Sequence, residues 1–152
     1  MNRSAAQAGQ GDDGRPSFSP GHSDKEESRR SLRLLVVEDE YLTALNTRYA
    51  LENEDYEIVD VVGSASDAVV AVEQYQPDLV LMDIRLSGSR DGVDAALEIY
   101  RRFGVRCIFA TAHADPATRM GAAAARPLGW LIKPYSDREL LQSLERARKE
   151  IH

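Results

Sequence analysis

The chain has 152 residues, of which 43% are hydrophobic and 29% are charged, and its formal net charge is −6. This length and composition fit one globular domain with its own core, and no apolar run approaches the ~20 residues that a membrane-spanning helix needs. The negative charge repels a phosphate backbone and argues against direct contact with nucleic acid. Because Cys107 is the single cysteine and no secretory signal opens the sequence, we expect a cytoplasmic location.

Residues 1–31 differ in composition from the rest of the chain. They are rich in Gly, Ser, Gln, Asp and Arg, they contain no Leu, Ile or Val, and Phe18 is their only aromatic residue. Such a segment buries too little apolar surface to offset the entropy that ordering would cost. We therefore predict a disordered tail over residues 1–31 and one folded domain over residues 32–152.

Beyond the tail, apolar stretches alternate with stretches of helical periodicity. Five strands are predicted, at residues 32–37, 56–62, 79–83, 105–110 and 128–132. A helix follows each strand, with predicted starts at or next to Tyr41, Ser64, Asp91, Asp115 and Ser136. This alternation, with short links, predicts an α/β fold with a doubly wound, five-stranded parallel sheet and helices on both faces.

Two of the predicted helices carry further expectations. The first spans residues 41–53 and has Leu42, Leu45 and Tyr49 at helical spacing. The fourth, up to about Ala125, consists almost wholly of Ala, Arg, Thr and Met, so we expect it to be weakly anchored.

The third strand ends in a carboxylate. Residues Leu79 to Met82 are apolar without alternation, which is typical of a parallel strand covered on both faces. Asp83 follows at the carboxyl end of the strand, the edge at which open α/β sheets bind ligands. Taken alone, Asp83 fits a loop or helix cap equally well.

Other polar residues follow their strands at the same edge: Glu38 and Asp39 after the first, Thr111 after the fourth and Lys133 after the fifth. Three carboxylates repel one another unless a cation lies among them, and hard oxygen ligands suit Mg²⁺. A lysine adds a compact positive charge and a threonine adds a hydrogen-bond donor. Each residue alone could be a cap or a surface group, but together with Asp83 they predict phosphoryl transfer to its carboxylate.

Four short motifs carry a resemblance to a known family: Val36 to Glu40, Leu81 to Asp83, Phe109 to Ala112, and Lys133-Pro134. In this order they resemble the receiver domain of bacterial two-component response regulators. The resemblance extends over residues 32–150. It implies a flavodoxin-like sheet with strand order 2-1-3-4-5.

The resemblance also implies how the site works. Asp83 would accept a phosphoryl group from a histidine kinase or a histidine phosphotransfer protein, with Lys133 beside it. Glu38, Asp39, Asp83 and the main-chain carbonyl of Arg85 would hold Mg²⁺. The peptide bond that follows Lys133 matches a cis X-Pro bond of the family.

A conformational switch is implied as well. Thr111 would turn toward the phosphoryl group and Trp130 would swing inward, changing a partner-binding surface around the fourth helix and fifth strand. One segment departs from the family pattern, because residues 86–92 lack the proline that most receivers carry after the phosphoacceptor. That loop is similar to a subgroup of stand-alone receivers.

We therefore expect a single-domain response regulator, not an enzyme, that acts through contact with proteins and binds neither nucleic acid nor membrane. An alternative is a phosphorylation-independent interaction module on the same fold. A third reading, a phosphatase of the haloacid-dehalogenase type, needs a second Asp two residues after Asp83, where Arg85 stands. The kinase, the downstream target and the oligomeric state stay open.

Overall fold

A computed structural model describes residues 31–151 of the chain. The predicted disorder of residues 1–31 therefore lies, apart from Ser31, outside the described residues, and it stays a prediction. Across residues 31–151, no helix combines the length and apolarity needed to cross a membrane.

Five parallel strands form one sheet in the order β3-β2-β4-β5-β6. Their bounds are β2 Leu32–Val37, β3 Tyr56–Val62, β4 Leu79–Asp83, β5 Cys107–Thr111 and β6 Gly129–Ile132. In chain order this is 2-1-3-4-5, so the predicted fold class and strand order are confirmed.

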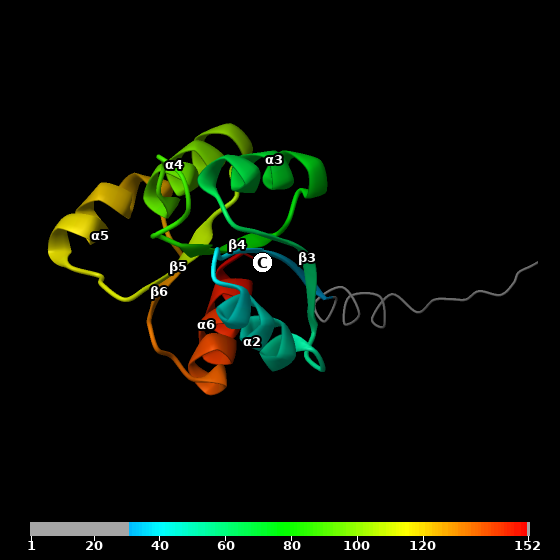
Figure 1. The fold of residues 1–152 in the computed structure, drawn as a ribbon. Coiled ribbons are helices and arrows are strands. Elements are labelled where there is room, and N and C mark those ends of the chain that lie inside the picture. Colours follow the sequence, from blue (N-terminus) through cyan, green and yellow to red (C-terminus); the bar gives the residue numbers. More distant parts are fainter. Residues whose placement is uncertain (1–30, 152) are drawn as a thin grey trace, which may run out of the picture. The chain divides into compact units, whose positions relative to one another are not determined.

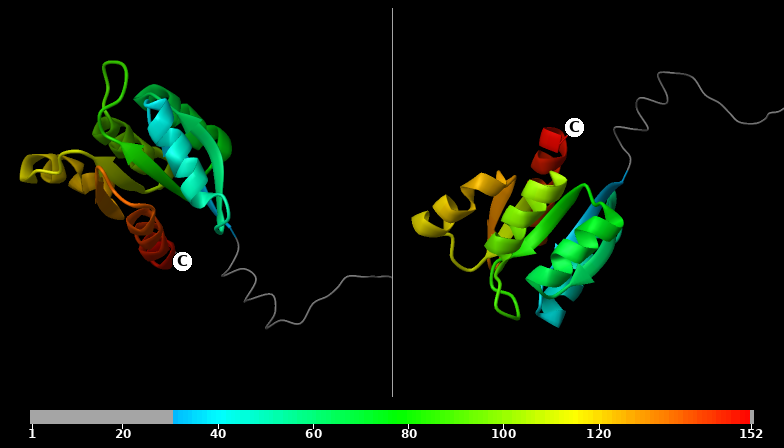
Figure 2. Two further views of the ribbon diagram at one scale, coloured as in Figure 1. Left: turned by 60° about the horizontal axis from the view of Figure 1, so that its bottom comes forward. Right: turned by 90° about the horizontal axis from the view of Figure 1, so that it is seen from above.

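Helices cover both faces of the sheet, as Figures 1 and 2 show. Their bounds are α2 Tyr41–Leu51, α3 Ala65–Tyr75, α4 Gly92–Phe103, α5 Pro116–Ala122, the 3₁₀ turn η1 Ala123–Ala125 and α6 Asp137–Ile151. The core on one face is built with α3, α4, α5 and η1, and the core on the other with α2 and α6. Successive strand residues point to opposite faces, and both faces are buried, so the strands are apolar without alternation.

The helix starts agree with the capping residues in the sequence. The side chains of Ser64, Asp91 and Asp115 each accept a hydrogen bond from the backbone N–H three residues on, at 3.1, 2.9 and 2.8 Å. Ser136 and Glu139 exchange reciprocal side chain to backbone bonds at the start of α6. These bonds satisfy N–H groups that a helix leaves unpaired, so local chemistry decides where each of these helices begins.

Helix α2 forms as predicted, but the apolar stripe noted in the sequence is not its buried face. Leu42 is 67% exposed and Tyr49 is 64% exposed. Its buried side chains are Ala44, Thr47 and Leu51, and the helix ends at Leu51, two residues before the predicted end. The side of α2 that carries Leu42 and Tyr49 therefore faces solvent, and the opposite side packs into the domain.

Helix α5 is as weakly anchored as its composition suggests. Ala122 is its only buried residue, and Met120 is exposed. The chain then continues as the 3₁₀ turn η1 to Ala125. Little apolar area therefore holds α5 to the rest of the domain.

Candidate functional site

The carboxyl ends of the strands bring the predicted site residues to one edge of the sheet. Glu38 directly follows β2, Asp83 ends β4, Thr111 ends β5 and Lys133 directly follows β6. The backbone N–H of Glu38 donates to the carbonyl of Val62 at 2.8 Å, which extends the pairing of β2 with β3 to this edge. Lys133 thus becomes a neighbour of Asp83, 50 positions away, and of Glu38, 95 positions away.

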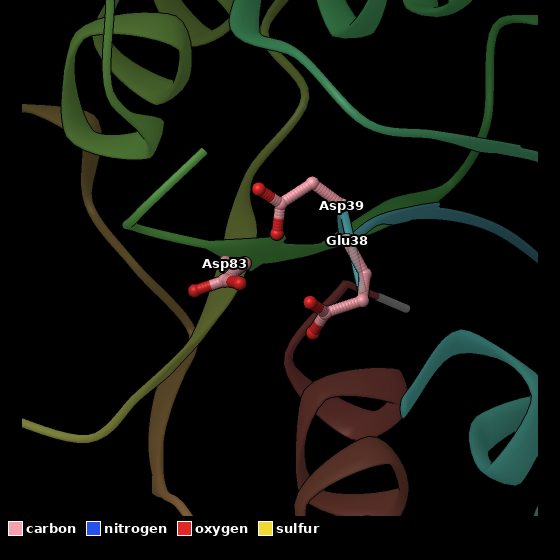
Figure 3. Close-up of side chains that lie close together, drawn as sticks. All are labelled: Glu38, Asp39 and Asp83. Carbon is pink, nitrogen blue, oxygen red and sulfur yellow. The ribbon is translucent and has the colours of Figure 1, made fainter. Parts of the chain in front are cut away.

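Three carboxylates converge at this edge. Ligand oxygens of Glu38, Asp39 and Asp83 lie within 4.8 Å of one another, and Figure 3 shows the side chains turned toward a shared space. Glu38 and Asp83 are buried, while Asp39 is exposed. Hard oxygen donors at this spacing, open to solvent on one side, match the coordination that Mg²⁺ takes in proteins.

Lys133 supplies the positive charge that these carboxylates need. Its Nζ donates to Glu38 Oε1 at 2.8 Å and to Asp83 Oδ2 at 3.1 Å. Although partial burial opposes the charged amine, its hydrogen bond to Glu38 and the charge of Asp83 raise the pKa of Lys133. The lysine therefore stays charged and bridges the two buried carboxylates.

For the pKa of Glu38, burial outweighs the hydrogen bonds, which is the opposite of the balance at Lys133. Burial raises the pKa of the Glu38 carboxyl above 4.5, and the negative charge of Asp83 adds to this effect. The hydrogen bond from Lys133 and the one from the backbone N–H of Glu40, at 3.1 Å, lower the pKa but do not outweigh burial. The fold therefore holds this carboxylate at an electrostatic cost, which a bound cation would offset.

Asp83 is held by groups on both sides. Its Oδ1 accepts a hydrogen bond from the backbone N–H of Arg85 at 3.2 Å, while Oδ2 faces Lys133. The side chain of Arg85 is exposed, and the metal-binding role of its main-chain carbonyl stays a prediction. The cis peptide bond between Lys133 and Pro134 is confirmed.

Thr111 and Trp130 share the α3/α4 face of the sheet, since Thr111 lies two residues after Phe109 and Trp130 pairs with Phe109 across the strands. The buried Thr111 hydroxyl donates to the carbonyl of His113 at 3.1 Å. The half-buried Trp130 ring stacks on Phe109, with centroids 4.8 Å apart, and the Arg119 guanidinium lies 4.7 Å from its centroid. Their roles in a switch stay predictions.

Two residues at the site were not predicted from the sequence. Ser87 Oγ donates to Asp39 Oδ2 at 3.2 Å, although residues 86–92 show only a loop composition. A Cβ on Gly92 would lie 2.0 Å from the carbonyl oxygen of Asp83, so only glycine lets α4 begin this close to the site. The sequence signal that could have indicated this close approach is the glycine directly after the helix-capping Asp91.

The strand order and the acidic edge together are typical of two-component signalling domains. The sequence model of the response regulator receiver domain matches residues 34–145, and the chain belongs to this family. Receiver domains are in general non-enzymatic signalling modules. They bind Mg²⁺ at this acidic pocket and receive phosphoryl groups from histidine kinases.

Curated relatives are longer proteins. The transcriptional regulatory protein PdtaR of Mycobacterium tuberculosis is 36% identical over 115 residues, which cover 76% of this chain and 56% of PdtaR. The DNA-binding response regulator MtrA of Mycolicibacterium smegmatis is 31% identical over 109 residues, covering 72% of this chain and 47% of MtrA. The chain thus spans about half the length of these relatives.

A solved structure shares the fold closely. The signal receiver domain of a modulated diguanylate cyclase from Desulfovibrio desulfuricans G20 superimposes with a TM-score of 0.73 at 32% identity. The match covers 80% of this chain and 96% of that domain.

Proposed function

We propose that the chain is a single-domain response regulator that accepts a phosphoryl group on Asp83 from a histidine kinase or a histidine phosphotransfer protein. The observation that carries the proposal is the convergence of Glu38, Asp39 and Asp83 within 4.8 Å, with Lys133 bonded to two of them. Membership of the receiver family supports the reaction type. We also propose that the receiver domain spans residues 32–152 and that the protein is cytoplasmic.

Each residue has a role in the transfer. A carboxylate oxygen of Asp83 attacks the phosphorus, the P–N bond of phosphohistidine breaks, and the released imidazole takes up a proton. Glu38, Asp39, Asp83 and the main-chain carbonyl of Arg85 would hold Mg²⁺, which supplies positive charge to the phosphoryl oxygens when bound. Transfer makes Asp83 an acyl phosphate and adds negative charge at the position that Lys133 Nζ faces at 3.1 Å.

The response would run through Thr111 and Trp130. The Thr111 hydroxyl exchanges its bond to His113 for one to the phosphoryl group, and the space it leaves admits the Trp130 ring. Trp130 lies on β6 and contacts Arg119 of α5. Because α5 is weakly anchored, a shift there changes the surface that α5 and β6 offer to a protein partner.

One observation favours a second function, a phosphorylation-independent interaction module. Lys133 already pairs with Glu38 and with Asp83, so the protein itself supplies a positive charge between its two buried carboxylates. This contact between strand ends is present without phosphate. Such a module would bind its partner equally well whether or not Asp83 carries a phosphoryl group.

The test is labelling by a small phosphodonor, acetyl phosphate, followed by the mass of the intact protein. We expect a gain of one phosphoryl group that needs Mg²⁺, disappears in Asp83→Ala and persists in Asp137→Ala, an exposed carboxylate on α6. Labelling that survives in Asp83→Ala would refute the assignment of the phosphoacceptor. Absence of labelling in the wild-type protein, by acetyl phosphate and by histidine kinases alike, would favour the interaction module.

A further inference from the structure

The loop between β4 and α4 is tied down at Ser87 and again at Arg90. The backbone of Ser87 forms an isolated parallel bridge with Ser64, which caps α3. Further along, Arg90 pairs with Asp94 at 2.6 Å and with Glu98 at 2.7 Å on α4. The loop is therefore held in place, and its side chains have defined positions relative to the acidic edge.

The three carboxylates of the edge are not held equally. Glu38 and Asp83 are buried, and each accepts one hydrogen bond from Lys133 and one from a backbone N–H. Asp39 is exposed, and within residues 31–151 its carboxylate accepts one hydrogen bond, from Ser87 Oγ at 3.2 Å. The orientation of Asp39 thus depends on one side chain of the β4–α4 loop.

We infer that Ser87 is a positioning residue for the cation site: its hydroxyl orients the carboxylate of Asp39 toward the space shared with Glu38 and Asp83. The bond occupies Oδ2 of Asp39 and leaves the other oxygen free for a cation. An aspartate already held in this orientation loses less rotamer freedom when the cation binds. This inference rests on the proposed function, because it presumes a divalent cation at the acidic edge.

The size of the effect follows from the kind of contact. Removal of a group that orients a metal ligand typically weakens metal binding by about 10- to 100-fold. The Ser87–Asp39 bond is long, at 3.2 Å, and water can replace the hydroxyl at an exposed site. We therefore expect a loss of about 5- to 10-fold in cation affinity for Ser87→Ala, near or below the lower end of that range.

The experiment measures Mn²⁺ binding to the whole chain from the electron paramagnetic resonance signal of the free ion, with Mg²⁺ as competitor. The variants are Ser87→Ala, Ser87→Thr, Asp39→Asn and the double variant of Ser87→Ala with Asp39→Asn. Ser89→Ala is the matched control. Ser89 lies in the same loop, is exposed, and has no side-chain hydrogen bond to the part of the chain that the structure describes.

Ser87→Ala should weaken Mn²⁺ and Mg²⁺ binding by the same factor while leaving the unfolding temperature unchanged. Ser89→Ala should bind as the wild type does, Ser87→Thr should restore affinity because it keeps the hydroxyl, and Ser87→Ala should add no loss to Asp39→Asn. Wild-type affinity in Ser87→Ala, or an equal loss in the Asp39→Asn background, would overturn the role of Ser87. If the wild type bound no cation, or Asp39→Asn bound like the wild type, the proposed metal site itself would fail.

Discussion

Gly92 offers a sharp test of how the site is packed, through the substitution Gly92→Ala. An added Cβ would lie 2.0 Å from the carbonyl oxygen of Asp83 and 2.9 Å from its carbonyl carbon, where real contacts almost never fall below 3.0 Å. The start of α4 or the end of β4 must then move by about 1 Å, because the obstructing atoms belong to the backbone and cannot rotate away. Overpacking costs typically about 1–3 kcal/mol, against a gain of about 1 kcal/mol in helix propensity.

Because backbone obstructs the methyl group, we expect an overpacking cost in the upper part of that range, about 3 kcal/mol. After the gain in helix propensity, the net loss in the free energy of unfolding is about 2 kcal/mol. For a domain of this size that loss lowers the unfolding temperature by roughly 6–10 °C. The assay is thermal unfolding by circular dichroism, combined with the rate of labelling by acetyl phosphate. The labelling rate should fall about 100-fold, since a shift of 1 Å at a reacting group has effects of that order.

Gly121→Ala is the matched control, because Gly121 also lies in a helix and its Cβ would meet nothing within 4 Å. There the same substitution should raise stability by up to about 1 kcal/mol through helix propensity alone. An unfolding temperature of Gly92→Ala equal to or above that of the wild type would refute the packing argument. Equal losses in the two variants would show that the effect does not come from contact with Asp83.

Two further predictions concern ionisable groups. Since the fold raises the pKa of Glu38, the folded state binds more protons than the unfolded chain above pH 4.5, and the free energy of unfolding falls as pH rises from 4.5 through the raised pKa. In EDTA at pH 7, Glu38→Gln should therefore unfold at a higher temperature than the wild type, and a lower unfolding temperature would contradict this reading. Without EDTA, the same variant should bind Mn²⁺ more weakly. Burial raises the pKa of the Cys107 thiol to about 12, so a disulfide reagent at pH 8 should modify it only after denaturation. Rapid modification of the native protein would show that Cys107 is accessible.

Much of the fold follows from local sequence. The apolar run from Leu79 to Met82 lacks alternation because both faces of β4 are buried, and that pattern is visible without coordinates. Capping side chains such as Ser64 and Asp115 start their helices through bonds to residues only three positions away. The alternation of strands and helices then leads to the parallel sheet, because short right-handed crossovers leave few other arrangements.

The main elements of the site were predictable for a related reason. In a parallel sheet the residues that follow the strands share one edge, so Glu38, Asp83 and Lys133 could be grouped from strand ends alone. The sheet topology already placed these residues together, and the resemblance to receiver domains then assigned a role to each of them. The exposure of Leu42 and Tyr49 on α2 was not predictable, because equal helical spacing does not say which side of a helix meets the sheet.

By itself, the sequence determined the parallel α/β sheet, the helix starts and the residues at the acidic edge, because each depends on local pattern or on topology, while the strand order came from the family resemblance. Only the tertiary structure decided how that edge is held together. Lys133 bridges Glu38 and Asp83, and Ser87 reaches Asp39 across 48 positions of sequence. Contacts of this kind depend on loop conformation and on ångström-scale packing, and neither leaves a periodic signal in the chain.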